Sequence, residues 1–333
     1  MTAENRGFFT ESLRDVYFRK RAEELALLLD DQTGGIRSEL SAPVQQCLVC
    51  DSVRRRQVFR KDGFEFQQCL ECGFIYADPQ IEEDKLKGFY EKSSYDAFVD
   101  VLLSDANRAY DRKKYNHGLD IIEHHVARGR LLDVGCSVGY FPALAMERGW
   151  EVTGLELNQR AVEHARNVLG VSVEQKLLKD IEDRTGYYRV VTLWGVIEHL
   201  RRPKDEIRRT YRLLEPGGAL LVFCPNVESL VCRVLRERAA TFDGQVHCGY
   251  FSPTTLHRLL EDTGYRVVHT EAAQADVRSL LNHLNFCDPY GATVSAGMDL
   301  SASLPAGFAE TLERYVLKHD LGYKMMMVAV KES

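Results

Sequence analysis

Two glycines at the end of an apolar segment are the first feature of this chain with a chemical use. Residues 131–139 read LLDVGCSVG, and the apolar residues around Asp133 are typical of a strand buried on both faces. Gly135 and Gly139 let the backbone turn sharply and approach a ligand. The turn lacks the middle glycine of the G-x-G-x-x-G motif, which brings the main chain close to a pyrophosphate. The pattern therefore favours a nucleoside-bearing cofactor without a pyrophosphate, and a plain strand-to-helix turn is the simpler alternative.

A carboxylate closes the next predicted strand. Residues 152–156 read VTGLE, which places Glu156 about 20 positions after Gly135. At that spacing an acidic residue meets the ribose hydroxyls of a bound nucleoside. Further apolar strands at 190–195 and 219–223 alternate with predicted helices. This alternation indicates an α/β, doubly wound, mostly parallel sheet.

Four of the nine cysteines have the spacing of a metal site. They form two C-x-x-C pairs with 18 residues between the pairs, and they are Cys47, Cys50, Cys69 and Cys72. Each pair presents two thiolates from a tight turn, and four thiolates suit tetrahedral Zn²⁺. We interpret the ion as structural, because four thiolates leave no open coordination position for water or substrate. Four unrelated buried cysteines and a redox pair are the alternatives.

Taken together, these segments resemble motifs of the class I S-adenosylmethionine-dependent methyltransferases. The segments are LLDVGCSVGYF, the acid at Glu156, VVTLWGVIEHL and LLEPGGALLVFCPN, and the resemblance covers about residues 115–333. It implies S-adenosylmethionine as cofactor and a seven-stranded, Rossmann-like sheet with residues 323–331 as an antiparallel edge strand.

The cysteine-rich module carries a second resemblance. It ends in CGFIYADP at residues 72–79 and is similar to the zinc module of a branch of bacterial methyltransferases. That branch includes sugar C-methyltransferases and enzymes of biosynthetic gene clusters. In the sugar enzymes the module helps to form the substrate side of the cleft, and the resemblance implies the same place here.

The resemblance also implies which residues hold the cofactor. We expect the backbone near Gly135, Cys136 and Gly139 to meet the methionine end, and Glu156 to bind the ribose. Asp133 is expected to order the loop or to reach the amino group through water. The remaining candidates follow the third and fourth strands, and they are Asp180, Ile181, Trp194 and Gly195.

Two histidines and a tyrosine are the candidates for catalysis. Methyl transfer from a sulfonium needs an aligned acceptor and, for a hydroxyl or an acidic carbon, a base at the carboxyl ends of the strands. His199 follows the fourth strand and meets this condition, with a helix cap or a loop contact as its alternative role. His247 is the rival, because a histidine and a tyrosine from this region transfer protons in the sugar enzymes that the chain resembles; helix entry is its alternative role. Tyr250 is the third candidate, with a buried wall as its alternative.

The sequence divides into four parts in this interpretation. They are an N-terminal helix at 8–30 with a linker (1–43), a zinc ribbon (44–80), a helical cap over the cofactor (81–128) and the methyltransferase domain (129–333). Helices are also predicted near 276–286 and 308–318, between the last two strands. We expect the residues between these two strands to form a lid or an oligomer contact, because a structureless connection of this length is unusual.

Composition limits the classes of function. The chain has 333 residues, 45% of them hydrophobic, and a net charge of -6. It can bury a full core, and the acidic balance argues against a nucleic-acid partner. No apolar run of membrane-spanning length and no apolar signal core is present, which predicts a cytoplasmic protein.

The expected acceptor is therefore a small molecule, such as a sugar or a secondary metabolite, methylated on oxygen, carbon or nitrogen. Two alternatives stay open at this point. One is an RNA or protein methyltransferase that docks through the zinc ribbon. The other is a NAD-type oxidoreductase, against which the missing middle glycine argues. The sequence does not predict the oligomeric state.

Overall fold

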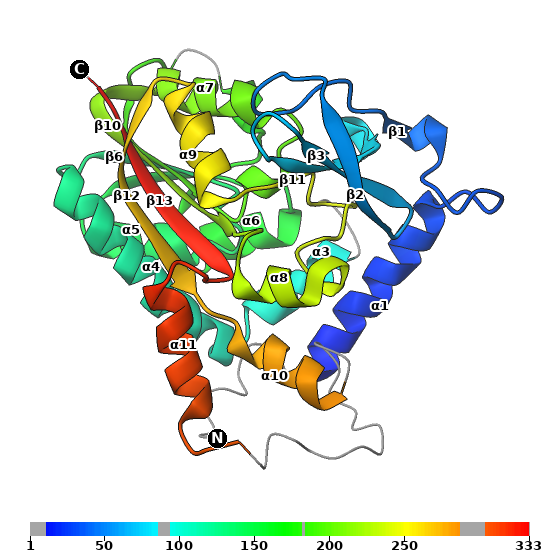
Figure 1. The fold of residues 1–333 in the computed structure, drawn as a ribbon. Coiled ribbons are helices and arrows are strands. Elements are labelled where there is room, and N and C mark those ends of the chain that lie inside the picture. Colours follow the sequence, from blue (N-terminus) through cyan, green and yellow to red (C-terminus); the bar gives the residue numbers. More distant parts are fainter. Residues whose placement is uncertain (1–10, 86–93, 182–183, 287–303, 333) are drawn as a thin grey trace.

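A seven-stranded mixed sheet with helices on both faces forms the centre of the molecule (Figure 1). The computed structural model describes residues 11–85, 94–181, 184–286 and 304–332. The strand order is β12-β13-β10-β9-β6-β7-β8. In chain order the strands are β6 (Arg130–Val134), β7 (Glu151–Leu155), β8 (Ser172–Glu174), β9 (Tyr188–Trp194), β10 (Leu214–Pro225), β12 (Tyr265–Gln274) and β13 (Lys324–Lys331). The predicted doubly wound architecture is confirmed.

The prediction for the last strand is right in direction and wrong in place. β13 pairs antiparallel with β10 on one side and with β12 on the other, so that β12 forms the edge. Residues 325–329 read MMMVA and are all buried. Such an unbroken apolar run is covered on both faces inside the sheet, whereas most of β12 is only half-buried.

Helices cover the sheet on both sides. On one face Leu119 and Phe141 pack against sheet residues such as Leu221. On the other face Ile207 and Leu259 are buried. The helices that supply these layers, or flank the β7–β8 end, are α4 (Asp105–His125), α5 (Tyr140–Glu147), α6 (Gln159–Asn167), α7 (Pro203–Leu213) and α9 (Pro253–Glu261). The carboxyl ends of the parallel strands are thereby left for the connecting loops.

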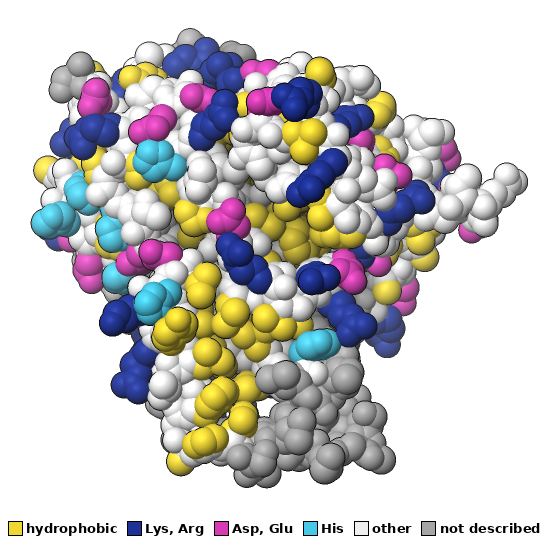
Figure 2. Space-filling view, in the orientation of Figure 1, with side chains coloured by type: hydrophobic (Ala, Val, Ile, Leu, Met, Phe, Trp, Pro, Cys, Tyr) yellow, Lys and Arg dark blue, Asp and Glu magenta, His cyan; other side chains and the backbone are white. Residues whose placement is uncertain are grey.

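Further helices lie in the connections between the strands. They are η3 (Leu178–Asp180), η4 (Ile197–His199), α8 (Leu230–Leu235), η5 (Arg236–Arg238), α10 (Val277–Phe286) and α11 (Phe308–Lys318). The helices predicted near 276–286 and 308–318 are confirmed as α10 and α11. Residues 287–303, between them, lie outside the described residues, so the expected lid or oligomer contact stays a prediction. Figure 2 shows hydrophobic side chains on the surface over α11, where Tyr315 is 56% exposed.

A second sheet joins the cysteine-rich module to the large domain. Its order is β11-β4-β3-β2, and it is built from β2 (Arg55–Lys61), β3 (Phe64–Cys69), β4 (Ile75–Asp78) and β11 (Gly249–Tyr250). Within the segment predicted as a zinc ribbon, β2 and β3 pair antiparallel as a hairpin. β11 belongs to the large domain, and the sequence gives no signal for it because two residues show no periodicity.

The N-terminal helix packs against the cap segment. α1 (Glu11–Leu28) contacts α3 (Ser94–Leu102), and the Ser94 N–H and hydroxyl donate to the Glu24 carboxylate at 2.9 and 2.6 Å. α1 ends before the predicted stop, because Asp30 caps a turn and Leu29 pairs with Ile36. The short elements nearby are η2 (Ser38–Leu40), β1 (Ser41–Ala42) and β5 (Gln80–Ile81). Among the helices described, none is long and apolar enough to cross a membrane.

Candidate active site

The turn after β6 requires both of its glycines. Gly135 has φ +69°, and a Cβ there would lie 2.8 Å from the Val196 Cγ2 atom. Gly139 has φ +86° at the N-terminus of α5, and a Cβ there would lie 2.7 Å from the Ala165 Cβ on α6. Both positions combine a left-handed backbone with close contacts that only glycine allows. The turn therefore approaches the loop after β9 at Gly135, and Gly139 allows α5 to pack closely against α6.

Glu156 follows β7 and faces the turn. Its Oε2 atom accepts the Ser137 N–H at 2.9 Å, and its Oε1 atom accepts the Leu157 and Asn158 N–H groups at 2.7 and 2.8 Å. The carboxylate is buried and lines the large cleft at the sheet edge. Burial raises the pKa of Glu156, and the three N–H groups oppose that rise. The three N–H groups occupy three of the roughly four acceptor sites of the carboxylate, which leaves about one site for a ligand hydroxyl.

The cleft has a volume of about 3830 Å³, several times that of an ordinary small-molecule pocket. Six of the predicted cofactor residues line it: Gly135, Cys136, Glu156, Asp180, Trp194 and Gly195. The other three do not line it. Asp133 is buried under the turn and accepts the Thr192 hydroxyl at 2.6 Å, Gly139 packs on α6, and Ile181 is buried. Burial raises the pKa of Asp133 to about 8. Its predicted role in ordering the loop stays a prediction.

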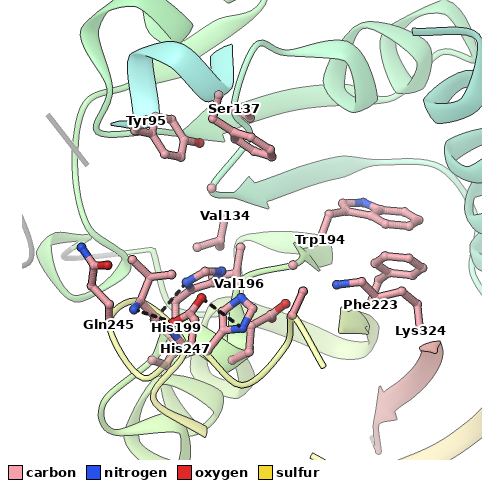
Figure 3. A pocket seen from close by; sticks show the side chains of 18 of the residues that line it. Tyr95, Val134, Ser137, Trp194, Val196, His199, Phe223, Gln245, His247 and Lys324 are labelled. Atoms are coloured by element: carbon pink, nitrogen blue, oxygen red, sulfur yellow. Dashed lines mark hydrogen bonds and ion pairs between the residues drawn. The ribbon is translucent and has the colours of Figure 1, made fainter. Parts of the chain in front are cut away.

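His199 and His247 lie side by side in the cleft although 47 residues separate them in the chain. Their ring centroids are 4.7 Å apart (Figure 3). The His199 Nδ1 lies 3.1 Å from the Val246 carbonyl, and the His247 Nδ1 lies 2.7 Å from the Thr241 carbonyl. Because a carbonyl only accepts, each Nδ1 carries a proton and each neutral ring keeps its lone pair on Nε2. Burial, with the other histidine, lowers the pKa of His199 to about 4, and burial lowers that of His247.

A buried carboxylate supports this pair. The Asp243 Oδ1 accepts the Val246 and His247 N–H groups at 3.0 and 3.1 Å, and its Oδ2 lies 3.8 Å from the His247 Nδ1. Arg21 of α1 lies 3.5 Å from the same Oδ2. Burial opposes ionisation, but His247, Arg21 and the two N–H groups hold the pKa of Asp243 at about 2. Sequence reasoning missed Asp243 and Arg21, because neither lies in a motif.

Tyr250 lies beside the pair but does not line the cleft. Its hydroxyl donates to the His247 carbonyl at 2.8 Å and accepts the Gly244 N–H at 3.1 Å. Both contacts are within the loop that carries His247. The structure thus places Tyr250 where it can hold that loop, in agreement with the buried-wall alternative, and not where its hydroxyl reaches a ligand in the cleft.

Several buried polar atoms of the cleft have no hydrogen-bond partner. Among the described residues these include Ser137 Oγ beside the glycine turn, Trp194 Nε1, Glu198 Oε2 and Gln245 Nε2. Buried polar groups in folded proteins are almost always paired, so these atoms are ready to bind a ligand. A nucleoside cofactor fits the Ser137 and Glu156 end of the cleft, and a polar acceptor fits the end with His199 and Gln245.

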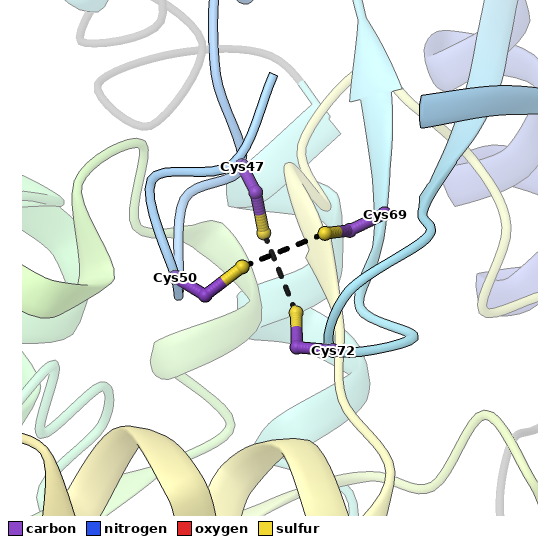
Figure 4. A group of neighbouring side chains, drawn as sticks. All are labelled: Cys47, Cys50, Cys69 and Cys72. Carbon is purple, nitrogen blue, oxygen red and sulfur yellow. Dashed lines mark hydrogen bonds between the residues drawn. The ribbon is translucent and has the colours of Figure 1, made fainter. Parts of the chain in front are cut away.

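The four predicted metal ligands come together in the cysteine-rich module (Figure 4). The Cys47 and Cys72 sulfurs are 3.6 Å apart, the Cys50 and Cys69 sulfurs 3.5 Å, and all four lie within 4.8 Å of one another. Sulfurs about 2.3 Å from one zinc ion in a tetrahedron are about 3.8 Å apart, so this group fits Zn²⁺.

A second group of possible ligands lies in the cleft. Glu198, His199 and His247 also offer ligand atoms within 4.8 Å of one another. Both imidazoles already donate a proton to backbone carbonyls. We interpret the two rings as proton acceptors and assign the metal to the four thiolates.

Comparisons with known proteins agree with this geometry. A family model described as a methyltransferase domain matches residues 107–270. A ubiquinone biosynthesis O-methyltransferase of Pseudomonas aeruginosa (strain UCBPP-PA14) is 30% identical over 107 residues, which are 30% of this chain and 46% of that protein. The namesake of Bordetella avium (strain 197N) is 33% identical over 95 residues, 27% of this chain and 39% of that protein. The match thus spans about half the length of these curated relatives, or less.

A solved structure has the same fold over most of the chain. Magnesium protoporphyrin IX methyltransferase from Synechocystis PCC 6803, crystallised with bound SAH, superposes with a TM-score of 0.51. It shares 12% identity and covers 75% of this chain and 100% of that chain. At this identity the similarity shows the fold alone.

Proposed function

We propose that this chain, whose residues 107–270 match a methyltransferase-domain model, transfers the methyl group of S-adenosylmethionine to an oxygen, carbon or nitrogen of a small molecule. The names of the curated relatives favour oxygen as the acceptor atom. The observation that carries the proposal is the hydrogen bond from the Ser137 N–H, in the turn after Gly135, to Glu156. It places a carboxylate that can accept a ribose hydroxyl beside a backbone that a ligand can approach. A sugar or a secondary metabolite is the substrate class that we infer from the zinc module.

The residues around the turn would hold the cofactor. Glu156 would bind the ribose by accepting one of its hydroxyls, and the backbone at Gly135 and Cys136 would meet the methionine end. Ser137, whose buried hydroxyl has no partner, would gain one. Asp180, Trp194 and Gly195 line the same cleft and would complete the contacts. Bound S-adenosylmethionine supplies an electrophilic methyl group on a sulfonium, and the protein has to position it and exclude water.

The histidine pair would accept the proton of the acceptor. As the acceptor oxygen forms its bond to the methyl carbon and the carbon–sulfur bond breaks, the Nε2 lone pair of one imidazole takes the hydroxyl proton. The products are the methyl ether, the demethylated thioether and an imidazolium, which returns the proton to solvent. Asp243 stabilises a positive charge on His247, and Tyr250 positions the loop that carries it. Both act through the histidine and are therefore positioning residues.

The zinc ribbon would serve as part of the active-site scaffold. Four thiolates would bind one structural Zn²⁺ and hold a module too small to have a large core of its own. All eight described cysteines are free thiols, which fits a reducing compartment such as the cytoplasm.

A screen for methyl transfer tests this function. The metal-replete protein is incubated with methyl-labelled S-adenosylmethionine and pools of sugar nucleotides, phenols and secondary-metabolite precursors. We expect one acceptor class to be labelled, and His199→Ala or His247→Ala to slow turnover by about 100-fold or more, as for other general bases. His257→Ala is the matched control, since His257 is 44% exposed on α9 and contacts Glu261. If both histidine variants keep a turnover rate within severalfold of the wild type, the assignment of the pair as the base is wrong.

RNA or protein methylation is the less favoured function. The ribbon arginines, which a docking module would leave available, contact their own module: Arg54 binds Glu71, Arg55 binds Asp78 and Arg56 binds Gln68. The net charge of -6 also disfavours a nucleic-acid partner. Tight, salt-sensitive binding of RNA would reverse this preference.

A further inference from the structure

Lys324 places an ammonium group inside the cleft. It begins β13 and pairs with Pro225, at the carboxyl end of β10, so its side chain starts at the edge of the sheet where ligands bind. Figure 3 shows the amine pointing from β13 into the space between the Trp194 and Phe223 side chains and the two histidines. Among the described residues, no carboxylate oxygen lies within 4.0 Å of the Lys324 Nζ. Within the described part of the chain this half-buried cation thus has no ion-pair partner, and its Nζ lies 5.5 Å from the centroid of the Tyr323 ring.

A second lysine in the cleft, Lys114, differs from Lys324 in having a carboxylate partner. Lys114 of α4 lines the same cleft, and its Nζ lies 2.7 Å from the Asp111 Oδ1 and 4.2 Å from the centroid of the Tyr115 ring. Lys114 is thus paired both with a carboxylate and with an aromatic face. Lys324 is close enough to disfavour the charge on Lys114. Among the described residues, the Asp111 carboxylate pairs with Lys114 and forms no ion pair with Lys324.

A second, independent observation comes from Gln245. It lines the cleft and is 2% exposed, yet its Nε2 atom has no hydrogen-bond acceptor. In Figure 3 Gln245 and Lys324 lie on opposite sides of the histidine pair. A molecule that fills the space beside the histidines would therefore meet a cation on one side and an unpaired amide donor on the other. Both groups call for acceptor oxygens on the ligand.

We propose that Lys324 is a subsite for the methyl acceptor and that the acceptor carries a carboxylate. This inference rests on the proposed function and adds the charge of the substrate to it. A carboxylate is favoured over a phosphate, because one ammonium balances a monoanion, whereas phosphate sites use several cations or a bidentate arginine. The aromatic walls at Trp194 and Phe223 suit an apolar body between the carboxylate and the nucleophile.

Binding of three small phenols tests the subsite. 4-Hydroxybenzoate, its neutral analogue 4-hydroxybenzamide and 4-hydroxyphenyl phosphate are titrated by calorimetry into the metal-replete protein saturated with S-adenosylhomocysteine. We expect the carboxylate to bind at least tenfold more tightly than the amide at low salt. In Lys324→Met the two should bind within twofold of each other. Lys318→Met, which removes an exposed charge on α11 outside the cleft, should keep the preference.

The outcomes distinguish a failure of the Lys324 subsite from a failure of the proposed function. Equal affinity for carboxylate and amide, no binding of the carboxylate at millimolar concentration, or a preference that survives in Lys324→Met would overturn the subsite. Tighter, Lys324-dependent binding of the phosphate would overturn the choice of a carboxylate. Lys324→Gln, which keeps a polar side chain, serves as second variant, and both variants should bind S-adenosylhomocysteine like the wild type. Failure of the wild type to bind S-adenosylhomocysteine would contradict the proposed function instead.

Discussion

The Ala77 N–H, in the cysteine-rich module, donates to the Cys248 carbonyl at 3.1 Å, and Cys248 directly follows His247. The contact continues as the pairing of β4 with β11, in which Gly249 faces Tyr76 and Tyr250 faces Ile75. The Cys248 N–H in turn donates to the Glu198 carbonyl at 2.7 Å. The zinc ribbon and the loops of both histidines are therefore connected through a continuous set of backbone hydrogen bonds.

This connection predicts that the zinc site supports catalysis more than cofactor binding. Cys72→Ser should lower kcat by tenfold or more, because the sheet that carries His247 loses its anchor, while the Kd for S-adenosylhomocysteine should change less than threefold. Turnover and calorimetry on the same preparation measure both quantities, and circular dichroism verifies the fold. Cys232→Ala, a buried cysteine outside the cluster, is the control. Equal losses of turnover and affinity would mean that the ribbon only stabilises the whole chain.

The histidine pair predicts the pH dependence of turnover. An imidazole accepts a proton only when neutral, so kcat should fall as the pH drops through its pKa. Burial, with the neighbouring histidine, holds the pKa of His199 at about 4, and burial holds that of His247 below its ordinary value. We therefore expect a plateau at neutral pH that extends below pH 6.5 before the acid limb begins. An acid limb centred above pH 7 would contradict the neutral, buried pair.

Asp243 should affect the pH at which kcat falls on the acid side. Its negative charge favours the protonated form of His247, so Asp243→Asn should lower the pKa of His247 further and move the acid limb to lower pH. The variant should also lose about tenfold or more in kcat, because the loop N–H groups lose a charged acceptor. pH–rate profiles of the wild type and the variant measure both effects. Asp262→Asn, at the exposed end of α9, is the control and should leave the pH–rate profile unchanged. If Asp243→Asn also leaves the profile unchanged, Asp243 has a purely structural role.

Gly139 predicts a stability difference between two glycine variants. Gly139→Ala suffers both backbone strain and a clash with Ala165, whereas Gly170→Ala has φ +68° and nothing within 4 Å of its added Cβ. We expect Gly170→Ala to cost about 1 kcal/mol in free energy of unfolding and Gly139→Ala about 2 kcal/mol more. Urea denaturation of both variants measures the difference. Equal costs would show that α5 and α6 can move apart freely at this contact.

Most of the fold could be predicted from the sequence because its signals are local. Buried parallel strands appear as apolar runs, the two C-x-x-C pairs indicate the cysteine cluster, and Gly135 with Glu156 indicates the end of the cleft where we propose that the cofactor binds. The place of β13 could not be predicted, since an apolar strand reveals its burial but not its neighbours.

The catalytic end was harder to predict because it is assembled from distant segments. The sequence presents His199 and His247 as rivals, whereas the fold puts their rings in contact. Asp243 and Arg21 lie in no motif, and their role depends on the packing of α1 beside the His247 loop. In the sequence Lys324 has no feature that distinguishes it from other lysines at strand ends. Only the pairing of β13 with β10 places it at the cleft.

The most direct test of the central claim is calorimetric titration of the metal-replete protein with S-adenosylhomocysteine. We predict one molecule bound per chain in the wild type and binding about 10- to 100-fold weaker in Glu156→Gln, because the ribose loses a charged acceptor. Glu174→Gln is the matched control, since Glu174 ends the next strand, does not line the cleft and pairs with Arg184, which does not line it either. No heat of binding in the wild type, or an affinity unaffected by Glu156→Gln, would contradict the account.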